Sequence, residues 1–340
     1  MYLTADLTDV PVLVLGDPHG ARRALRRYAA AGASVRSVPA PEQLGPDDVR
    51  GAALAVVVGD GTRRWREVLH DLGARVPVVL EPAAQDVGRV TLVGGGPGAD
   101  DLLTVRAVQA LQGADVVLVD RLAPAGAVAA AAPGAHIIPV GKTPGHHPVP
   151  QSRIQEVMVE HALEGRSVVR LKGGDPYVFG RGGEELAACA AHGIPVDVVP
   201  GVTSAVSVPG AAGIPVTFRE VSRMFTVASG HVPFSEQELA HFAGLGAAGG
   251  TLVVLMGMNT LPHLVAGLVR AGADPATPLA VVEKGFTDQQ RSTVTTLADA
   301  VADITVAGCG SPAVVVVGPV VRLASAERDA FLAEVTAHGC

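Results

Sequence analysis

The segment 168–185, VVRLKGGDPYVFGRGGEE, concentrates the residue types of this sequence that are best suited to chemistry. An apolar run carrying one arginine breaks at Gly-Gly-Asp-Pro, and a second glycine pair lies between Arg181 and the acidic residues Glu184 and Glu185. Because Gly-Gly-Asp-Pro cannot continue a strand or enter a helix interior, the pattern predicts a loop after a short strand. Paired glycines let another group approach the backbone closely. Taken alone, the segment favours a structural turn with a surface ion pair.

Charged residues also follow two short apolar runs. The run 116–119 (VVLV) is followed by Asp120 and Arg121, and the run 136–140 (HIIPV) is followed two residues later by Lys142. Ligands bind at the carboxyl ends of strands in a parallel sheet, which would place Asp120 and Lys142 at the ligand crevice. Asp120 would then either bind a ribose, as in a dinucleotide fold, or form a surface pair with Arg121.

Metal-ligating residue types are present without the spacing of a metal site. His146 and His147 are adjacent and lack a third ligand at a suitable distance, so they favour loop polarity over metal binding. The three cysteines are far apart and form no CxxC pair, which is typical of reduced cytosolic thiols. We therefore expect no bound metal and no disulfide among Cys189, Cys309 and Cys340.

Composition favours an α/β protein of two or three domains in 340 residues. Hydrophobic residues make up 48% and aromatic residues 3%, which suits short Val/Ala/Leu strands with alanine-rich helices. A net charge of −7 argues against non-specific nucleic-acid binding. The chain begins without a basic leader and no apolar run approaches ~18 residues, so we expect no secretion and no membrane span. A cytoplasmic location follows.

Residues 1–88 predict a small βαβ unit with a parallel sheet, a truncated Rossmann-like domain. Apolar runs alternate with helical patterns, in the order strand 11–16, helix 20–31, strands 34–38 and 54–58, helix 62–72, and strand 76–80. A dinucleotide fingerprint would need GxGxxG after the first strand. The sequence instead has GDPHGA, in which Pro18 replaces a glycine and Asp17 would repel a pyrophosphate. NAD binding is therefore not expected.

Residues 89–200 predict a second α/β domain after a linker at 81–88. The strand 89–93 ends in GGGPG, Asp100 and Asp101 are positioned to cap a helix at 102–112, and Gly113 is positioned to end it. Since Pro97 removes a backbone donor from the glycine loop, a ligand without phosphates suits it better than a nucleotide phosphate.

Residues 201–325 predict a third α/β domain with a mixed sheet. A helix of small residues begins near residue 203, and the apolar strand 251–256 ends on Met256. A methionine at that position is more typical of a core than of a cofactor contact. The tail 326–340 predicts a short helix.

The ordered motifs closely resemble the tetrapyrrole methylase family over residues 89–322. They are LVGGGPG, VDRL, VGKTPGHHPVPQ, VVRLKGGDPYVFGRGGEE, VVPGVTSA, GIPVTFR and LVVLMGM. Residues 1–88 resemble the N-terminal dehydrogenase domain of siroheme synthases through PVLVLG…ARRALRRYAAAGASV and AVVVGDGTRRW, but the dimerisation and chelatase portions have no counterpart.

The resemblance implies two α/β domains that bind S-adenosylmethionine (SAM) between them, usually in a homodimer. It implies two methyl transfers to uroporphyrinogen III, through precorrin-1 to precorrin-2, for siroheme or cobalamin synthesis. Asp120 and Lys142 match the family's proposed proton acceptor and donor, and Arg181, Glu184 and Arg219 match residues at the tetrapyrrole. The matching SAM-site positions are Pro97, Gly173, Gly174, Asp175, Val178, Thr203, Ser204, Met256 and Gly285.

The residue chemistry suits this activity. Methyl transfer to carbon needs an in-line approach and leaves a cation that must lose a proton, which either Glu184 or Asp120 could accept. The eight carboxylates of the substrate suit cations, above all arginine forks. Besides Lys142 and Arg181, the available cations include Arg121, Arg219 and Arg223.

Three local departures separate the sequence from the usual family pattern. Ala99 lies between Gly98 and Asp100, Thr143 replaces a basic residue, and Ser229 replaces a threonine. The alternatives are another precorrin methyltransferase of the same fold, a bifunctional enzyme that also uses NAD for precorrin-2 oxidation, and a non-enzymatic regulator that binds SAM or a tetrapyrrole.

Overall fold

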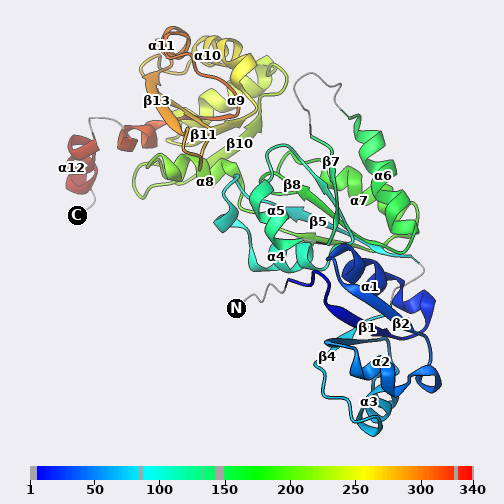
Figure 1. The fold of residues 1–340 in the computed structure, drawn as a ribbon. Helices are drawn as coiled ribbons and strands as arrows, with labels where there is room; N and C mark the ends of the chain where they lie inside the picture. Colours follow the sequence, from blue (N-terminus) through cyan, green and yellow to red (C-terminus); the bar gives the residue numbers. More distant parts are fainter. Residues whose placement is uncertain (1–5, 84–86, 133, 142–148, 325–327, 339–340) are drawn as a thin grey trace. The chain divides into compact units, whose positions relative to one another are not determined.

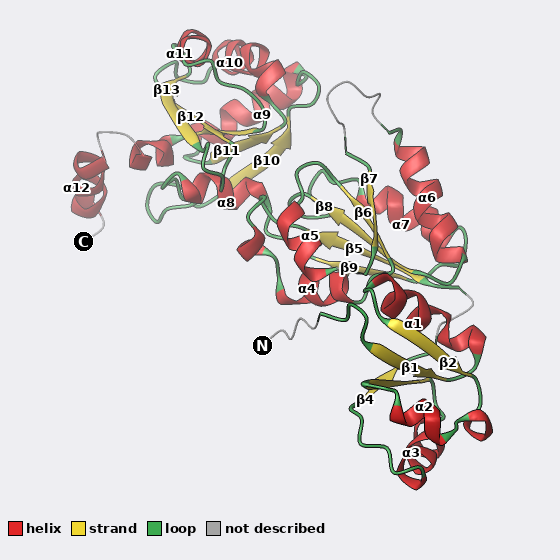
Figure 2. Ribbon diagram, viewed as in Figure 1, coloured by secondary structure: helices red, strands yellow, loops and turns green. Residues whose placement is uncertain are grey.

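A computed structural model describes residues 6–83, 87–132, 134–141, 149–324 and 328–338 (Figure 1). The chain divides into two compact units. One comprises residues 1–95 and 103–201, and the other comprises residues 96–102 and 202–340. Each unit is an assembly of helices and β-sheets, as the secondary-structure colouring of Figure 2 shows.

The amino-terminal part of the first unit contains a four-stranded, wholly parallel sheet in the order β2-β1-β3-β4. This confirms the predicted parallel βαβ arrangement. Trp65 is 4% exposed and packs in the core with Leu13 and Leu69. The elements are β1 (Pro11–Leu15), α1 (Pro18–Ala30), β2 (Ser34–Val38), α2 (Pro46–Arg50), β3 (Leu54–Val58), α3 (Thr62–Asp71) and β4 (Val78–Glu81).

The two residues that break the dinucleotide fingerprint begin helix α1. The Asp17 carboxylate accepts hydrogen bonds from the backbone N–H groups of His19 (2.9 Å) and Gly20 (3.0 Å). Pro18 occupies the first turn, where its missing N–H costs no helical hydrogen bond. The sequence Asp-Pro therefore forms a self-contained helix cap.

The remainder of the first unit contains a five-stranded parallel sheet in the order β7-β6-β8-β5-β9. Val/Leu-rich strands in its centre are buried, as expected for a parallel sheet covered by helices. All its strands present their carboxyl ends at one edge. The elements are β5 (Arg89–Gly94), α4 (Val105–Gln112), β6 (Val116–Val119), α5 (Ala125–Ala131), β7 (His136–Pro139), α6 (Gln151–Leu163), β8 (Ser167–Lys172), α7 (Gly182–Ala190) and β9 (Val196–Val199).

The predicted start of the first helix in this domain was wrong. Asp100 and Asp101 lie in a separate 3₁₀ turn, Asp100–Leu102, and α4 is capped by the Thr104 hydroxyl, which accepts from the Ala107 N–H at 3.2 Å. Thr104 is the better cap because it directly precedes the helical turn that its side chain satisfies. The predicted end of this helix at Gly113 is confirmed.

The second unit contains a five-stranded mixed sheet in the order β10-β11-β14-β12-β13, which confirms the mixed-sheet prediction. Only the β10–β11 pairing is parallel among its described pairings. The elements are α8 (Ser204–Ala211), β10 (Phe225–Ser229), α9 (Glu236–Ala247), β11 (Thr251–Leu255), α10 (Leu261–Arg270), β12 (Pro278–Glu283), β13 (Arg291–Thr296), α11 (Ala300–Val306), β14 (Ala313–Val317) and, in the tail, α12 (Arg328–His338).

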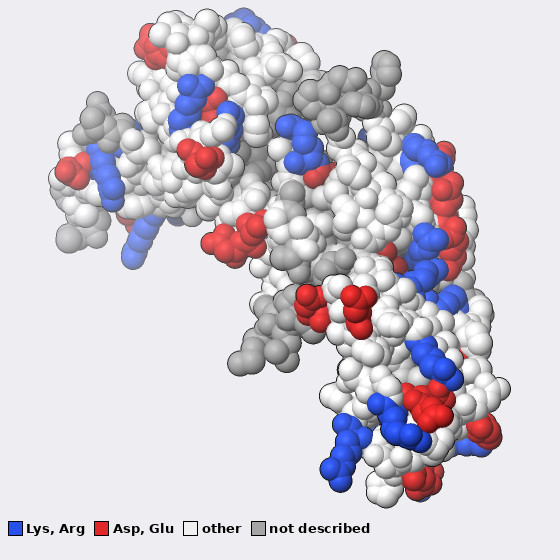
Figure 3. Space-filling view, viewed as in Figure 1, with Lys and Arg blue, Asp and Glu red and all other residues white. Residues whose placement is uncertain are grey.

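On the face seen in Figure 3, Lys and Arg side chains are interspersed with Asp and Glu. None of the helices in the described part of the chain is long and apolar enough to cross a membrane.

Candidate active site

A buried cluster of charged side chains lies at the carboxyl edge of the parallel sheet in the first unit. Arg170 and Lys172 belong to β8, and Glu185 belongs to α7, which follows β8 in the chain. Residues two apart on a strand share a face, so Arg170 and Lys172 point the same way. These side chains are almost wholly inaccessible: Arg170 is 2% exposed, Lys172 3% and Glu185 0%.

Glu185 is the centre of this cluster. Its Oε1 accepts hydrogen bonds from Arg170 Nε (2.9 Å), Lys172 Nζ (3.1 Å) and Gln151 Nε2 (3.0 Å). Its Oε2 lies 3.0 Å from Lys172 Nζ. A buried carboxylate needs such partners, because burying an unpaired charge lowers the stability of the fold by several kcal/mol.

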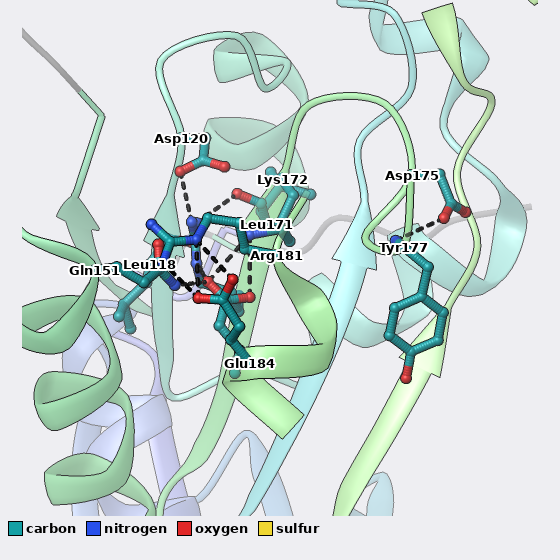
Figure 4. Close-up of polar contacts among 11 residues, drawn as sticks. Leu118, Asp120, Gln151, Leu171, Lys172, Asp175, Tyr177, Arg181 and Glu184 are labelled. Carbon is teal, nitrogen blue, oxygen red and sulfur yellow. Dashed lines mark hydrogen bonds and ion pairs between the residues drawn. The ribbon is translucent and has the colours of Figure 1, made fainter. Parts of the chain in front are cut away.

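Arg170 links this centre to Asp120, which directly follows β6. Arg170 Nη2 donates to Asp120 Oδ1 at 2.7 Å, and Arg170 Nη1 donates to the Leu171 carbonyl at 3.1 Å. The Asp120 side chain is 29% exposed, so its carboxylate joins the buried cluster to the surface. Figure 4 shows Asp120, Lys172 and Gln151 arranged around this network.

The cluster contains two cations and two carboxylates and so carries no net charge when all four groups are ionised. Burial lowers the pKa of Lys172, and the neighbouring Arg170 lowers it further, whereas Glu185 and Asp120 oppose the shift. The lowered pKa records the cost of holding an ammonium group in the interior.

Arg181 and Glu184 form a second, exposed pair at the start of α7. Arg181 has a left-handed backbone (φ 59°) as the N-cap residue, and its Nε donates to both Glu184 oxygens at 3.1 and 2.9 Å. The hydrogen bond from Arg181 lowers the pKa of Glu184, and the same bond raises the pKa of Arg181. The helix begins at Gly182, because the left-handed residue Arg181 turns the chain directly into it.

The glycines after β8 pack against the protein's own backbone. An added Cβ at Gly201 would overlap the Gly174 carbonyl oxygen and lie 2.6 Å from Gly94 Cα. Asp175 fastens the same junction: its carboxylate accepts from the N–H groups of Tyr177 (2.8 Å) and Gly201 (3.1 Å). The sequence predicts that a ligand approaches these glycines closely, but in the structure it is the backbone of three loops of the parallel sheet that does so.

The second unit holds the other candidate SAM-site residues. The Thr203 hydroxyl caps α8 by accepting from the Ala205 N–H at 3.3 Å, and Ser204 is the first helical residue. Gly285 follows β12 and lies against α8, because a Cβ there would meet the Val208 side chain at 2.7 Å. Met256 follows β11 with a left-handed backbone (φ 57°).

One expectation for a single residue needs correction. The reading of Met256 as a core residue was wrong, because its side chain is 50% exposed. Arg219 is 93% exposed at its side chain and pairs with Glu220 at 3.4 Å, so it belongs to the surface of the second unit. Pro97 also falls in the second unit. Lys142 lies outside the described residues, as do His146 and His147.

The first unit brings together part of the predicted site. Asp120 and Arg121 follow β6, and the segment from the end of β8 into the first turn of α7 carries the other described predictions: Gly173, Gly174, Asp175, Val178, Arg181 and Glu184. Sequence reasoning missed the charged cluster around Glu185. Its signal was present, since two cations spaced two apart in an otherwise apolar strand indicate a buried carboxylate partner. The described residues contain no group of three or more metal-ligating side chains.

Comparisons with known proteins agree on one family. The family model described as tetrapyrrole (corrin/porphyrin) methylases matches residues 89–301. A protein of Methanosarcina barkeri named S-adenosyl-L-methionine-dependent uroporphyrinogen III methyltransferase is 46% identical over 238 residues, covering 69% of this chain and 93% of the relative. A siroheme synthase of Azotobacter vinelandii is 45% identical over 241 residues, covering 71% of this chain. The chain spans about half of that relative, 52% of its length.

A solved structure agrees with the sequence relatives. Uroporphyrin-III C-methyl transferase from Thermus thermophilus, complexed with S-adenyl homocysteine, is 39% identical and superposes with a TM-score of 0.58. The match covers 69% of this chain and all of that chain. The fold, the matched family model and the near-complete coverage of a 46% identical relative together show that the chain belongs to the tetrapyrrole methylase family.

Proposed function

We propose that the chain is a methyltransferase that moves two methyl groups from SAM to carbon atoms of uroporphyrinogen III and so forms precorrin-2. The observation that carries this proposal is the 46% identity to a uroporphyrinogen III methyltransferase across 93% of that relative. The T. thermophilus structure with S-adenyl homocysteine supports the choice of methyl donor. Precorrin-2 would supply siroheme or cobalamin synthesis.

The candidate residues for SAM are accessible to a ligand. Gly173, Val178, Thr203 and Ser204 are each partly exposed, and Met256 is half exposed, so their surfaces are open to a ligand. SAM supplies an electrophilic methyl on a sulfonium centre. These residues, together with Pro97, Gly174, Asp175 and Gly285, would bind and orient it, and the protein contributes rate mainly by aligning donor and acceptor carbon.

We propose Asp120 as the base that removes the proton from the methylated ring. Asp120 matches the family's proposed proton acceptor, whereas Glu184 matches a residue at the tetrapyrrole and is the alternative base. Arg181 would instead release Glu184 to bind a substrate carboxylate, with Arg121 and Arg219 as further cations. Lys142 stays the candidate proton donor by family position alone.

An anaerobic assay tests the activity. Purified protein is incubated with SAM and uroporphyrinogen III, and the products are separated and weighed by mass spectrometry. We expect a gain of two methyl groups and formation of S-adenosylhomocysteine. Failure to form a doubly methylated product would overturn the proposal, and turnover only with an already methylated precorrin would favour another methylase of the same fold.

For residues 1–88 we propose a packing or assembly role without NAD. The amino end of α1, where a pyrophosphate would bind, is already satisfied by the Asp17 carboxylate, whose charge would repel a phosphate. Adding NAD to the assay and watching for reduced cofactor tests this separately. We further propose a cytoplasmic location and a homodimer, as is usual in the family. Sedimentation of the purified protein tests the homodimer.

A further inference from the structure

We infer that Arg170 is a positioning residue, which fixes the Asp120 carboxylate while Glu185 fixes Arg170. The inference rests on the proposed function, in which Asp120 accepts a proton from the substrate. It concerns Arg170 and Glu185, to which neither the sequence patterns nor the family resemblance assigned a role. The geometry is a chain of contacts from α7, through β8, to the residue that follows β6.

Each nitrogen of the Arg170 guanidinium donates to a neighbouring group. Nε donates to Glu185, Nη1 to the Leu171 carbonyl, and Nη2 to Asp120, at 2.9, 3.1 and 2.7 Å. The side chain is 2% exposed, so little water competes for these bonds. A planar guanidinium presents its donors in fixed directions, whereas an ammonium group is a compact charge on a flexible stem. Only arginine can therefore bond to all three acceptors at once.

Glu185 holds this fork in place because its carboxylate is fully buried and accepts hydrogen bonds from three donors. Three donors converge on Oε1, and Lys172 also lies 3.0 Å from Oε2. Lys172 adds a second positive charge, so Glu185 keeps a cationic partner while Arg170 also serves Asp120. The four charges sum to zero with Asp120 ionised, which is the form that accepts a proton.

Asp120 needs such support because it lies at an exposed edge. Its side chain is 29% exposed, and its position is set by Oδ1, the oxygen bonded to Arg170. Arg170 donates to Oδ1, and we assign the other oxygen, Oδ2, to the substrate. Without Arg170 the carboxylate would rotate among its side-chain conformers, and a displacement of about 1 Å at a reacting group costs about 100-fold in rate.

The test compares Arg170→Lys with wild type in the methylation assay. We expect kcat to fall about 100-fold, with KM for both substrates and the affinity for S-adenosylhomocysteine unchanged. The matched control is Arg166→Lys, just before the same strand, where Arg166 pairs with Glu164 and contacts His161. We expect that control to stay within roughly twofold of wild type.

A double variant distinguishes positioning from general damage. If Arg170 acts through Asp120, adding Arg170→Lys to Asp120→Asn should cost nothing further. An equal loss in both backgrounds, a loss carried by KM, or an unchanged kcat in Arg170→Lys would each overturn the inference. Free guanidinium should also partly restore Arg170→Ala, and where that variant does not fold, Arg170→Lys carries the test.

A structural readout separates this inference from the proposed function. If the wild-type chain makes no methylated product, the proposed function fails, while crystals of Arg170→Lys still show whether the Asp120 carboxylate has left its wild-type position. The same crystals decide the matter if Asp120→Asn has no measurable turnover. An unmoved Asp120 in Arg170→Lys would overturn the positioning role.

Discussion

Glu184 and Glu185 are adjacent in the chain but meet opposite environments at the start of α7. Glu184 is about half exposed and pairs with Arg181 one turn earlier, whereas Glu185 is 0% exposed and anchors two cations. The helix separates them because neighbouring residues point about 100° apart. One carboxylate can therefore exchange its partner for a ligand, and the other is confined to the interior.

This contrast predicts different costs of neutralising each carboxylate. We expect Glu185→Gln to lower the free energy of unfolding by about 3–5 kcal/mol, because it leaves two buried cations short of a partner. The matched control Glu184→Gln should cost at most about 1 kcal/mol, since the pair is exposed. Urea unfolding measures both, and equal effects would contradict the assignment of Glu185 as the anchor.

Replacing Arg181 with alanine should lower activity without changing the fold. Loss of its proposed hydrogen bonds to a substrate carboxylate in Arg181→Ala should cost about 1.5–3 kcal/mol in kcat/KM, or roughly 10- to 150-fold. Calorimetric affinity for S-adenosylhomocysteine should stay unchanged. The control Arg153→Ala removes an exposed arginine of α6 that pairs with Glu156, and should leave kcat/KM intact. Lost S-adenosylhomocysteine binding in Arg181→Ala would contradict the role in tetrapyrrole binding.

At the scale of elements, the loops after β5, β8 and β9 meet through glycine backbone. Gly201→Ala would force its Cβ into the Gly174 carbonyl, and we expect a loss of stability of about 1–3 kcal/mol or more. Gly183→Ala is the control: a Cβ there has no atom within 4 Å, and alanine in α7 should stabilise by about 0.5–1 kcal/mol. Thermal melting measures both, and a neutral Gly201→Ala would show that the junction can open.

The β12–β13 hairpin contains a carboxylate with a lowered pKa. Burial raises the pKa of Glu283, but hydrogen bonds from Arg291 and the Gly310 N–H together outweigh it. The folded-state pKa therefore lies below the ordinary value of 4.5. The stabilisation is fully present above pH 4.5 and is lost as the pH falls through the folded-state pKa.

We therefore expect the second unit to lose stability on acidification below this range, and Glu283→Gln to lose less than wild type over the same interval. Urea unfolding followed by circular dichroism at a series of pH values measures the difference. Identical slopes against pH for the two proteins would mean that Glu283 does not contribute to acid sensitivity.

Strands formed by apolar runs could be predicted from the sequence, whereas a polar strand at the edge of a sheet could not. The runs at β6 and β11 were located, whereas β13 (RSTVTT) alternates polar residues and becomes a strand through its pairing with β12. Helix α9 carried an unused signal, the capping box from Ser235 to Glu238. Asp120 could be predicted from its place at a strand end. The spacing of Arg170 and Lys172 in an apolar strand indicates a buried carboxylate partner, but which carboxylates they contact depends on packing between elements.

At the scale of the whole molecule, the family match begins at residue 89 and leaves an amino-terminal sheet outside it. Arg23 of that sheet's α1 pairs with Asp115 at 3.3 Å, but Asp115 also accepts from the Ser167 N–H at 2.8 Å. Asp115 would therefore keep a partner if the sheet were removed. The domain boundaries after residues 88 and 200 stay predictions.

This arrangement predicts that residues 87–340 alone retain methyl transfer. We expect kcat/KM of the same order as the full chain, because the M. barkeri relative is 93% covered by 69% of this chain. The steady-state assay with SAM and uroporphyrinogen III checks this, with circular dichroism as the control for folding. A folded but inactive fragment would assign the amino-terminal sheet a part in catalysis.

The position of Trp65 has a practical consequence for such experiments. It is the single tryptophan of the chain, and it is buried in the amino-terminal sheet domain. Tryptophan fluorescence therefore reports the unfolding of this domain, because the two methylase domains contain no tryptophan. If the fluorescence transition comes at a lower temperature than the circular-dichroism transition, the amino-terminal sheet domain unfolds before the methylase domains.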